Sequence, residues 1–235
     1  MKLLLTFILF NINPIVLADS DSALEVNQSI VADYLFNSDL SSSIFGAPDL
    51  EYLGNNLNYQ EETIFGITKT VADFVAGEGF KLDVSNLITS EEYSIAMVFK
   101  ISIISGYTKL IDFKNLVDDE GLYSLDGKLR FFPNTIGDEV TIPENQFVQL
   151  FFTRNISGLY KGYIDQELQF EYDDIGGDSI PELLLHFFRD DMATSNLENS
   201  PGSVTRITIF NKALTQAEIQ KFLPIDTIIF CNGFE

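Results

Sequence analysis

The chain has 235 residues and carries 14 Lys and Arg residues against 35 Asp and Glu residues, which gives it a formal net charge of −21. It contains one Cys, one His and no Trp. A single Cys excludes an intramolecular disulfide framework, and one His with one Cys excludes a zinc site of the usual type. The negative charge repels phosphate backbones, so we expect no nucleic-acid partner.

The first 18 residues have the pattern of a cleaved signal peptide. Lys2 precedes an apolar run, and Val16 and Ala18 occupy the small-residue positions of a cleavage site before Asp19. The alternative is a membrane anchor, but a bilayer span needs about 20 predominantly apolar residues, and two Asn and a Pro interrupt this run. We therefore expect an exported protein, secreted or held in the periplasm or at the cell surface, with no transmembrane segment after signal removal.

Period-two alternation of apolar residues dominates the rest of the chain. Residues 94–104 place five apolar side chains on one face, the pattern of a half-buried strand: Ile95, Met97, Phe99, Ile101 and Ile103. Residues 146–154 and 205–210 repeat this pattern. Shorter strands are predicted at residues 30–35, 50–53, 80–84, 108–113, 122–125, 128–132, 159–164, 168–172 and 183–188.

Turn signals join neighbouring strands into hairpins. Asp126-Gly127 is a two-residue hairpin turn, because Gly accepts the positive φ that such turns need, and residues 155–158 join the next pair. A dozen short strands with hairpin spacing predict an all-β fold, with two antiparallel sheets packed as a jelly-roll sandwich. Inward-facing residues of the three longest strands should form one core: Ile95, Phe99, Ile101, Val148, Leu150, Phe152, Ile207 and Ile209.

One helix is predicted near the end of the chain, over residues 216–222. Thr215 and Glu218 form a capping box, and Leu214 and Ile219 occupy the positions of a hydrophobic staple. Pro224 ends the helix. We expect this helix to lie on the sandwich as a structural brace.

Two stretches of the chain resemble a known family. Residues 202–220, GSVTRITIFNKALTQAEIQ, resemble the closing strand and helix of a LamG-like jelly-roll domain of the concanavalin A-like lectin/glucanase superfamily. Residues 148–165, VQLFFTRNISGLYKGYID, resemble the central hairpin of that family, with Gln166 where the family has Gly. Further segments resemble a bacterial secreted subset. The resemblance implies one domain over residues 30–223, with a lead-in at residues 19–29 and a short tail at residues 224–235.

The superfamily includes lectins, glycosidases and adhesion modules, so particular residues must decide between these classes. Its hydrolases carry three acids on one strand, as E-x-D-x-x-E or E-x-D-x-E. The nearest string here, at Glu171 and Asp173, lacks the third acid and runs into a Gly-Gly turn. His186 lies among apolar residues, which favours a core or strand-face position. We therefore predict a non-catalytic binding module rather than a glycoside hydrolase.

The resemblance also implies a calcium site at the rim of the sandwich, where relatives hold Ca²⁺ with loop carboxylates and carbonyl oxygens. Two acidic loops supply such groups, one after residue 113 and one between residues 189 and 202. The predicted ligands are Asp119, Asp190 and Asp191, with Asn115 and Glu198 as further ligands. The alternative is that these loops are acidic only because the whole chain is acidic.

Carbohydrate recognition is the usual role that this architecture implies, and it needs aromatic rings with polar neighbours. The candidate ligand-binding residues are Tyr107, Tyr123, Tyr160 and Tyr163. The alternative is that tyrosines alternating along strands pack in the core, and the chain lacks Trp, the most usual stacking residue. We predict a glycan-binding module; the competing hypothesis is a structural or protein-interaction (adhesion) module of the cell envelope.

The tail combines a β-prone segment at residues 227–230 with the lone Cys231. After export, this thiol could form an intermolecular disulfide. The alternative is a loose chain end with one unpaired Cys.

Overall fold

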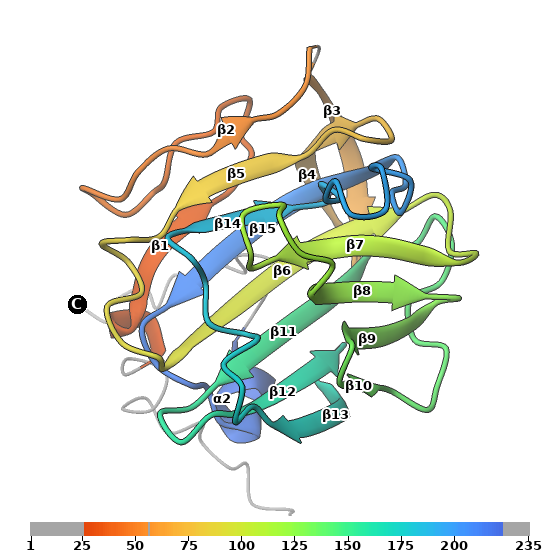
Figure 1. Ribbon diagram of the computed structural model, residues 1–235. Coiled ribbons are helices and arrows are strands. Elements are labelled where there is room, and N and C mark those ends of the chain that lie inside the picture. The colour runs from red at the N-terminus through yellow and green to blue at the C-terminus, as the bar shows by residue number, and fades with distance from the viewer. Residues whose placement is uncertain (1–25, 56, 223–235) are drawn as a thin grey trace, which may run out of the picture.

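The computed structural model describes residues 26–55 and 57–222. Within them, two antiparallel sheets stack face to face as a sandwich (Figure 1), which confirms the predicted fold class. The predicted signal peptide, most of the lead-in and the tail with Cys231 lie outside the described residues. None of the helices in the described part of the chain has the length and apolar character needed to cross a bilayer.

The first sheet, sheet A, contains the longest strands, and β15 lies in its interior between β6 and β4. Its order is β13 (Glu167–Asp173), β12 (Leu159–Ile164), β11 (Val148–Arg154), β6 (Tyr93–Ile101), β15 (Gly202–Phe210), β4 (Ile67–Phe74) and β3 (Asn58–Ile64). The first residues of β15 pair with β4, and its last residues pair with β1 (Ile30–Tyr34). β15 is therefore hydrogen-bonded on both sides and buried along its whole length.

The second sheet, sheet B, faces the viewer in Figure 1. Its order is β10 (Thr135–Ile136), β9 (Lys128–Phe132), β8 (Gly121–Leu125), β7 (Tyr107–Asp112), β14 (Leu184–Phe187), β5 (Phe80–Asp83) and β2 (Glu51–Tyr52). The predicted hairpin turn between β8 and β9 is confirmed, since Asp126 and Gly127 have φ angles of 51° and 80°. These positive values are what a two-residue turn between twisted strands requires.

The space between the sheets holds the main core, and all eight predicted core residues belong to it. Phe152 stacks on Phe131 of sheet B with ring centroids 5.7 Å apart. The prediction for Ile103 is wrong: β6 ends at Ile101, and Ile103 is 44% exposed. The prediction that β6 is half-buried is also wrong, because other elements cover its outward side chains as well.

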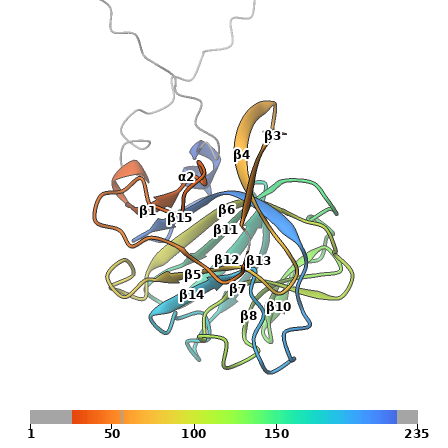
Figure 2. The same cartoon turned by 90° about the horizontal axis from the view of Figure 1, so that it is seen from above.

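One of these covering elements is the predicted helix, α2 (Gln216–Lys221), which lies on the outer face of sheet A (Figure 2). The capping box is confirmed: the Thr215 hydroxyl accepts from the Glu218 backbone N–H, and the Glu218 carboxylate accepts from the Thr215 backbone N–H. Leu214 and Ile219 pack with Phe151 and other outward residues of sheet A. A further helical turn at residues 26–28 was not predicted.

The hairpin of β3 and β4 was also not predicted, and it projects from the sandwich in Figure 2. Most β3 side chains are polar and exposed, so the strand lacks the apolar alternation on which the prediction depended. Its turn is Phe65-Gly66, with φ angles of 49° and 85°. Phe65 therefore has a positive φ, which the turn requires and which is rare for a residue with a side chain. The residue is 54% exposed at the tip of the hairpin.

Candidate functional site

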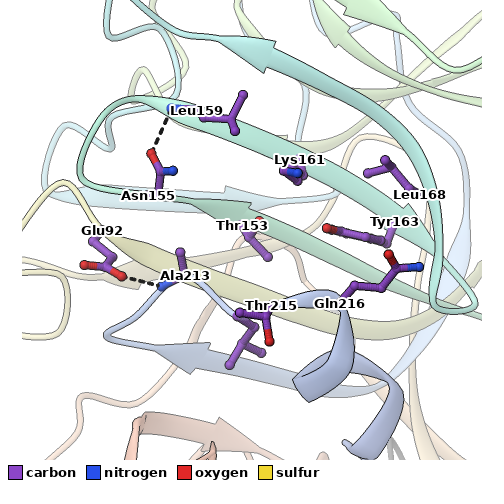
Figure 3. A pocket seen from close by; sticks show the side chains of 11 residues that line it. Glu92, Thr153, Asn155, Leu159, Lys161, Tyr163, Leu168, Ala213, Thr215 and Gln216 are labelled. Atoms are coloured by element: carbon purple, nitrogen blue, oxygen red, sulfur yellow. Dashed lines mark hydrogen bonds between the residues drawn. The ribbon is translucent and has the colours of Figure 1, made fainter.

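A hollow of about 380 Å³ lies beside α2 on the outer face of sheet A (Figure 3). Its floor comes from outward-facing residues of β11, β12 and β13, and its wall from the segment that leads into α2. Period-two alternation places Thr153 of β11 and Lys161 and Tyr163 of β12 on this face, because their neighbours in sequence point into the core. The volume falls within the range of about 300–1,000 Å³ that is typical of ligand clefts.

The lining of this hollow is mixed. Apolar surface comes from Leu159, Leu168, Ala213 and Leu214. Polar groups come from Glu92, Thr153, Asn155, Lys161, Tyr163, Thr215 and Gln216. Such a lining, with apolar patches between hydrogen-bonding groups, matches the alternating C–H and hydroxyl surface of a sugar.

Several of the polar groups are already fixed by the fold. Asn155 Oδ1 accepts from the backbone N–H of Leu159, and Glu92 Oε1 accepts from the backbone N–H of Ala213 over 3.2 Å (Figure 3). Lys161 Nζ lies 2.8 Å from Glu171 Oε2 at a partly exposed position. Gln216 points toward Tyr163 in Figure 3. Asn155 and Glu92 are therefore held by backbone groups, whereas Gln216 is exposed and Lys161 is partly exposed.

The four tyrosines proposed as ligand-binding residues lie in different places. Tyr163 borders the hollow described above but is itself only 3% exposed, and Tyr107 is half-buried on the outer face of sheet B. The prediction is wrong for Tyr123 and Tyr160, which are completely buried and offer no ring face to a ligand. Tyr160 packs between the sheets against Phe131 and Phe152.

The outer face of sheet B carries a second group of aromatic residues, arranged around an arginine that the sequence analysis did not select. The Tyr107, Tyr123 and Phe132 rings meet edge to face, with interplanar angles of 81° to 89°. The guanidinium carbon of Arg130 lies 5.5 Å from the Tyr107 centroid and 5.3 Å from the Phe132 centroid. We call these four residues the Arg130 cluster.

The two acidic loops predicted to bind calcium do meet, and they meet around a lysine. Lys109 Nζ is completely buried; it lies 2.7 Å from Asp191 Oδ2 and 3.5 Å from Asp112 Oδ2. Asp119 reaches the same place, since its Oδ1 accepts from the Tyr123 hydroxyl and its backbone oxygen lies 3.5 Å from Lys109 Nζ. The available sequence signal for this cluster was a lysine next to the apolar residues Leu110 and Ile111 of a predicted strand.

Asp190 and Glu198 complete the acidic group. Asp190 Oδ2 accepts from the Thr194 hydroxyl and from the Glu198 backbone N–H, whereas its buried Oδ1 has no partner among the described residues. Burial, reinforced by the charges of Asp119 and Asp190, raises the pKa of Glu198 to about 7. Burial likewise raises the pKa of Asp190. The cluster therefore holds more negative charge than Lys109 alone neutralises.

Asn115, the remaining predicted ligand, is exposed, and no hydrogen bond joins its side chain to this group within the described residues. Within residues 26–55 and 57–222, no set of three His, Cys, Asp or Glu side chains has a geometry that would hold a metal ion. His186 is buried on β14, with Nδ1 3.7 Å from Asp112 Oδ1. The calcium site stays a prediction, and its remaining candidate oxygens are those of Asp119, Asp190, Asp191 and Glu198.

Comparison with known proteins gives a fold but no family. No family model and no curated protein sequence matches the chain. Among solved structures, domain 4 of AbnA, a GH43 extracellular arabinanase from Geobacillus stearothermophilus, solved with arabinotriose, aligns at a TM-score of 0.63 and 19% identity, over 82% of this chain and 97% of that domain.

Receptor-binding domains of botulinum neurotoxins match as well. The serotype D binding domain aligns at a TM-score of 0.59 and 18% identity, over 84% of this chain and 52% of that one. The serotype D domain in complex with N-acetylneuraminic acid aligns at a TM-score of 0.59 and 19% identity, over 85% of this chain and 52% of that one. The chain thus spans nearly all of the arabinanase domain but about half of each neurotoxin domain. These similarities establish the β-sandwich jelly-roll fold alone.

Proposed function

We propose that the protein is an exported, non-catalytic glycan-binding module of the LamG-like type, and that the hollow beside α2 holds the sugar. The observation that carries the proposal is the mixed lining of this hollow, in which the exposed Gln216, the partly exposed Lys161 and the largely buried Tyr163 lie among apolar residues. A saccharide can pack its C–H groups on the apolar patches while its hydroxyls bond to the polar ones.

The similar structures support this proposal by analogy. The arabinanase domain was solved with arabinotriose, and a neurotoxin domain was solved with N-acetylneuraminic acid. Those ligands belong to those proteins. They support a saccharide as the ligand class here because both proteins contain a sandwich of this fold, which aligns with nearly all of the arabinanase domain and with about half of the neurotoxin domain.

A binding role without catalysis is consistent with the positions of the candidate acids. Glu171 is exposed and paired with Lys161, and Asp173 is exposed at the end of β13. Asp174, the next acid, is buried; its carboxylate accepts from Ser179 and from Arg154 Nε, at 3.3 Å for the latter. These contacts support a structural role for Asp174.

Calcium and export are further parts of the proposal. A cation bound by Asp119, Asp190, Asp191 and Glu198 would assist binding indirectly, by holding two loops on sheet B. Export rests on the first 18 residues. N-terminal sequencing of the exported protein should give Asp19 as the first residue, whereas an intact Met1 in the membrane fraction would contradict export.

The competing function is a protein-interaction module of the cell envelope. Its candidate contact residues are the fully exposed Phe45 and the exposed Phe65 at the hairpin tip, two large apolar side chains that a protein partner would cover. A neurotoxin binding domain, about half of which aligns with this chain, was solved in complex with rat synaptotagmin II.

A glycan array probed with the mature protein tests the proposal. Binding to a defined set of saccharides should fall at least about tenfold in Lys161→Ala and Gln216→Ala, because each removes a hydrogen-bonding group from the hollow. Gln60→Ala, an exposed site on β3, serves as the matched control and should bind like the wild type. A silent array together with capture of one protein partner that depends on Phe45 or Phe65 would favour the competing function.

A further inference from the structure

Arg130 differs from two other arginines of this acidic protein. Arg154 pairs with Asp174 and Glu91, and Arg206 pairs with Asp33. Arg130 makes no ion pair and no side-chain hydrogen bond within the described residues, although the chain has 35 acids. Its Nε is buried without an acceptor. A guanidinium has five N–H donors, so leaving them without an anion is unusual.

The side chain is nevertheless held in place. Arg130 and Tyr123 are directly opposite on β9 and β8, so the completely buried Tyr123 ring forms a floor beside it. The Tyr107 and Phe132 rings flank the guanidinium at 5.5 Å and 5.3 Å. Both rings are half-buried, so each keeps part of its surface open. The cation is thus oriented by aromatic contacts, and its terminal N–H groups have no acceptor among the described residues.

We infer that the Arg130 cluster binds the carboxylate of an acidic sugar unit. A carboxylate matches the fork of N–H donors on a guanidinium, and the C–H face of a pyranose ring can pack on Tyr107 or Phe132. This inference names the sugar class for a second surface and rests on the proposed glycan-binding function.

The surroundings favour a single carboxylate over a polyanion. Lys109 is buried and paired with Asp191, and the Lys128 ammonium donates to the backbone oxygen of Asp138. Of Lys109, Lys128 and Arg130, only Arg130 has no acceptor among the described residues. A net charge of −21 also repels any ligand with many negative charges.

The surroundings also favour a sugar over an acidic peptide. Peptides often bind a sheet by adding a strand to an open edge. Here β9 pairs with β8 on one side, and Ile136 of β10 pairs with Arg130 on the other. Both sides of the backbone at Arg130 are occupied, so no strand can add there.

Titration calorimetry of the mature chain with digalacturonate, its neutral methyl ester and 3′-sialyllactose tests the inference. At least one acidic sugar should bind. If digalacturonate binds, its methyl ester should bind at least about tenfold more weakly, because the ester cannot form the charge-assisted hydrogen-bond pair. Arg130→Gln should abolish the binding of the acidic sugar. Arg130→Lys should recover only part of it, because an ammonium lacks the planar fork.

Arg189→Gln is the matched control and should bind like the wild type. Within the described residues Arg189 also lacks an ion pair, but unlike Arg130 it has no cation–π contact with a ring. Unchanged melting temperatures would show that each variant is folded. Equal affinity for acid and ester, an equal loss in Arg189→Gln, or no binding of either acidic sugar would overturn the inference. If the preference for acid is lost in Gln216→Ala but kept in Arg130→Gln, the acidic sugar lies in the hollow; the proposed function then stands and this inference fails.

Discussion

The backbone N–H of Lys109 donates to the carbonyl oxygen of Glu198 over 2.8 Å, so the loop between β14 and β15 is hydrogen-bonded directly onto β7. The same lysine places its ammonium against Asp191 of that loop. Backbone and side chain of one residue therefore both hold the loop in place. These contacts bring the acids of the loop to sheet B, although Glu198 follows Lys109 by nearly 90 positions in the sequence.

Loss of the Lys109 ammonium should strongly destabilise the protein. Lys109→Met leaves the carboxylates of Asp191 and Asp112 buried without their cation, and breaking a buried pair in this way costs about 3–5 kcal/mol. Urea denaturation measures the change in the free energy of unfolding. Lys81→Met is the control, because its pair with Glu51 is partly exposed and should contribute about 0–1 kcal/mol. Equal losses for both variants would contradict the role of burial.

Glu198 should make stability fall as the pH rises. Its pKa is about 7 in the folded protein, against 4.5 for an ordinary Glu in water, so between these values the folded state holds a proton that the unfolded chain has released. Protons bound preferentially by the folded state make the free energy of unfolding decrease with rising pH across this window and level off above it. Glu198→Gln should reduce the decrease between pH 5 and pH 8, whereas Glu61→Gln on exposed β3 should leave it unchanged. Identical pH profiles for Glu198→Gln and the wild type would contradict this assignment.

Calcium should stabilise the acidic cluster, because Asp190 Oδ1 and Glu198 Oε2 are buried without partners among the described residues and repel each other. A ligand at 100 times its dissociation constant adds about 2.7 kcal/mol to the free energy of unfolding, which should appear as a raised melting temperature that a chelator reverses. Asp190→Asn should abolish the response while leaving the sandwich folded. A melting temperature that is unchanged across millimolar calcium would show that Lys109 alone serves as the cation.

Phe152→Ala should cost about 3–5 kcal/mol, as large-to-small aromatic changes in cores do. Phe152 is completely buried and contacts Phe131 and Tyr160, so its removal leaves a cavity between the sheets. Phe65→Ala at the exposed hairpin tip removes the same ring and should change stability by no more than about 0.5 kcal/mol. Chemical denaturation of the two variants gives the comparison; similar losses would mean that the ring at position 152 is not part of the core.

Most strands and the main core were predictable because alternation is a local property. Phe152 and Ile95 point inward for the same reason, a period of two along the chain, and that period needs no knowledge of the partner strand. The capping box of Thr215 and Glu218 was predictable for a similar reason, since its hydrogen bonds join residues three positions apart. The β3 strand escaped prediction because it projects from the sandwich and has little apolar surface to bury.

The sequence by itself determined the fold class, the core and the start of α2, because these depend on contacts between near neighbours or on which side chains share a face. Only the tertiary structure decided what covers the outer faces of the two sheets. Alternation places Tyr107, Tyr123 and Tyr163 on outward faces, but it does not tell which of them α2 or a distant loop will cover. The same limit applies to Lys109 and Arg130. Lys109 meets a carboxylate of a loop far away in the sequence, whereas Arg130 meets none within the described residues. That difference arises from long-range packing.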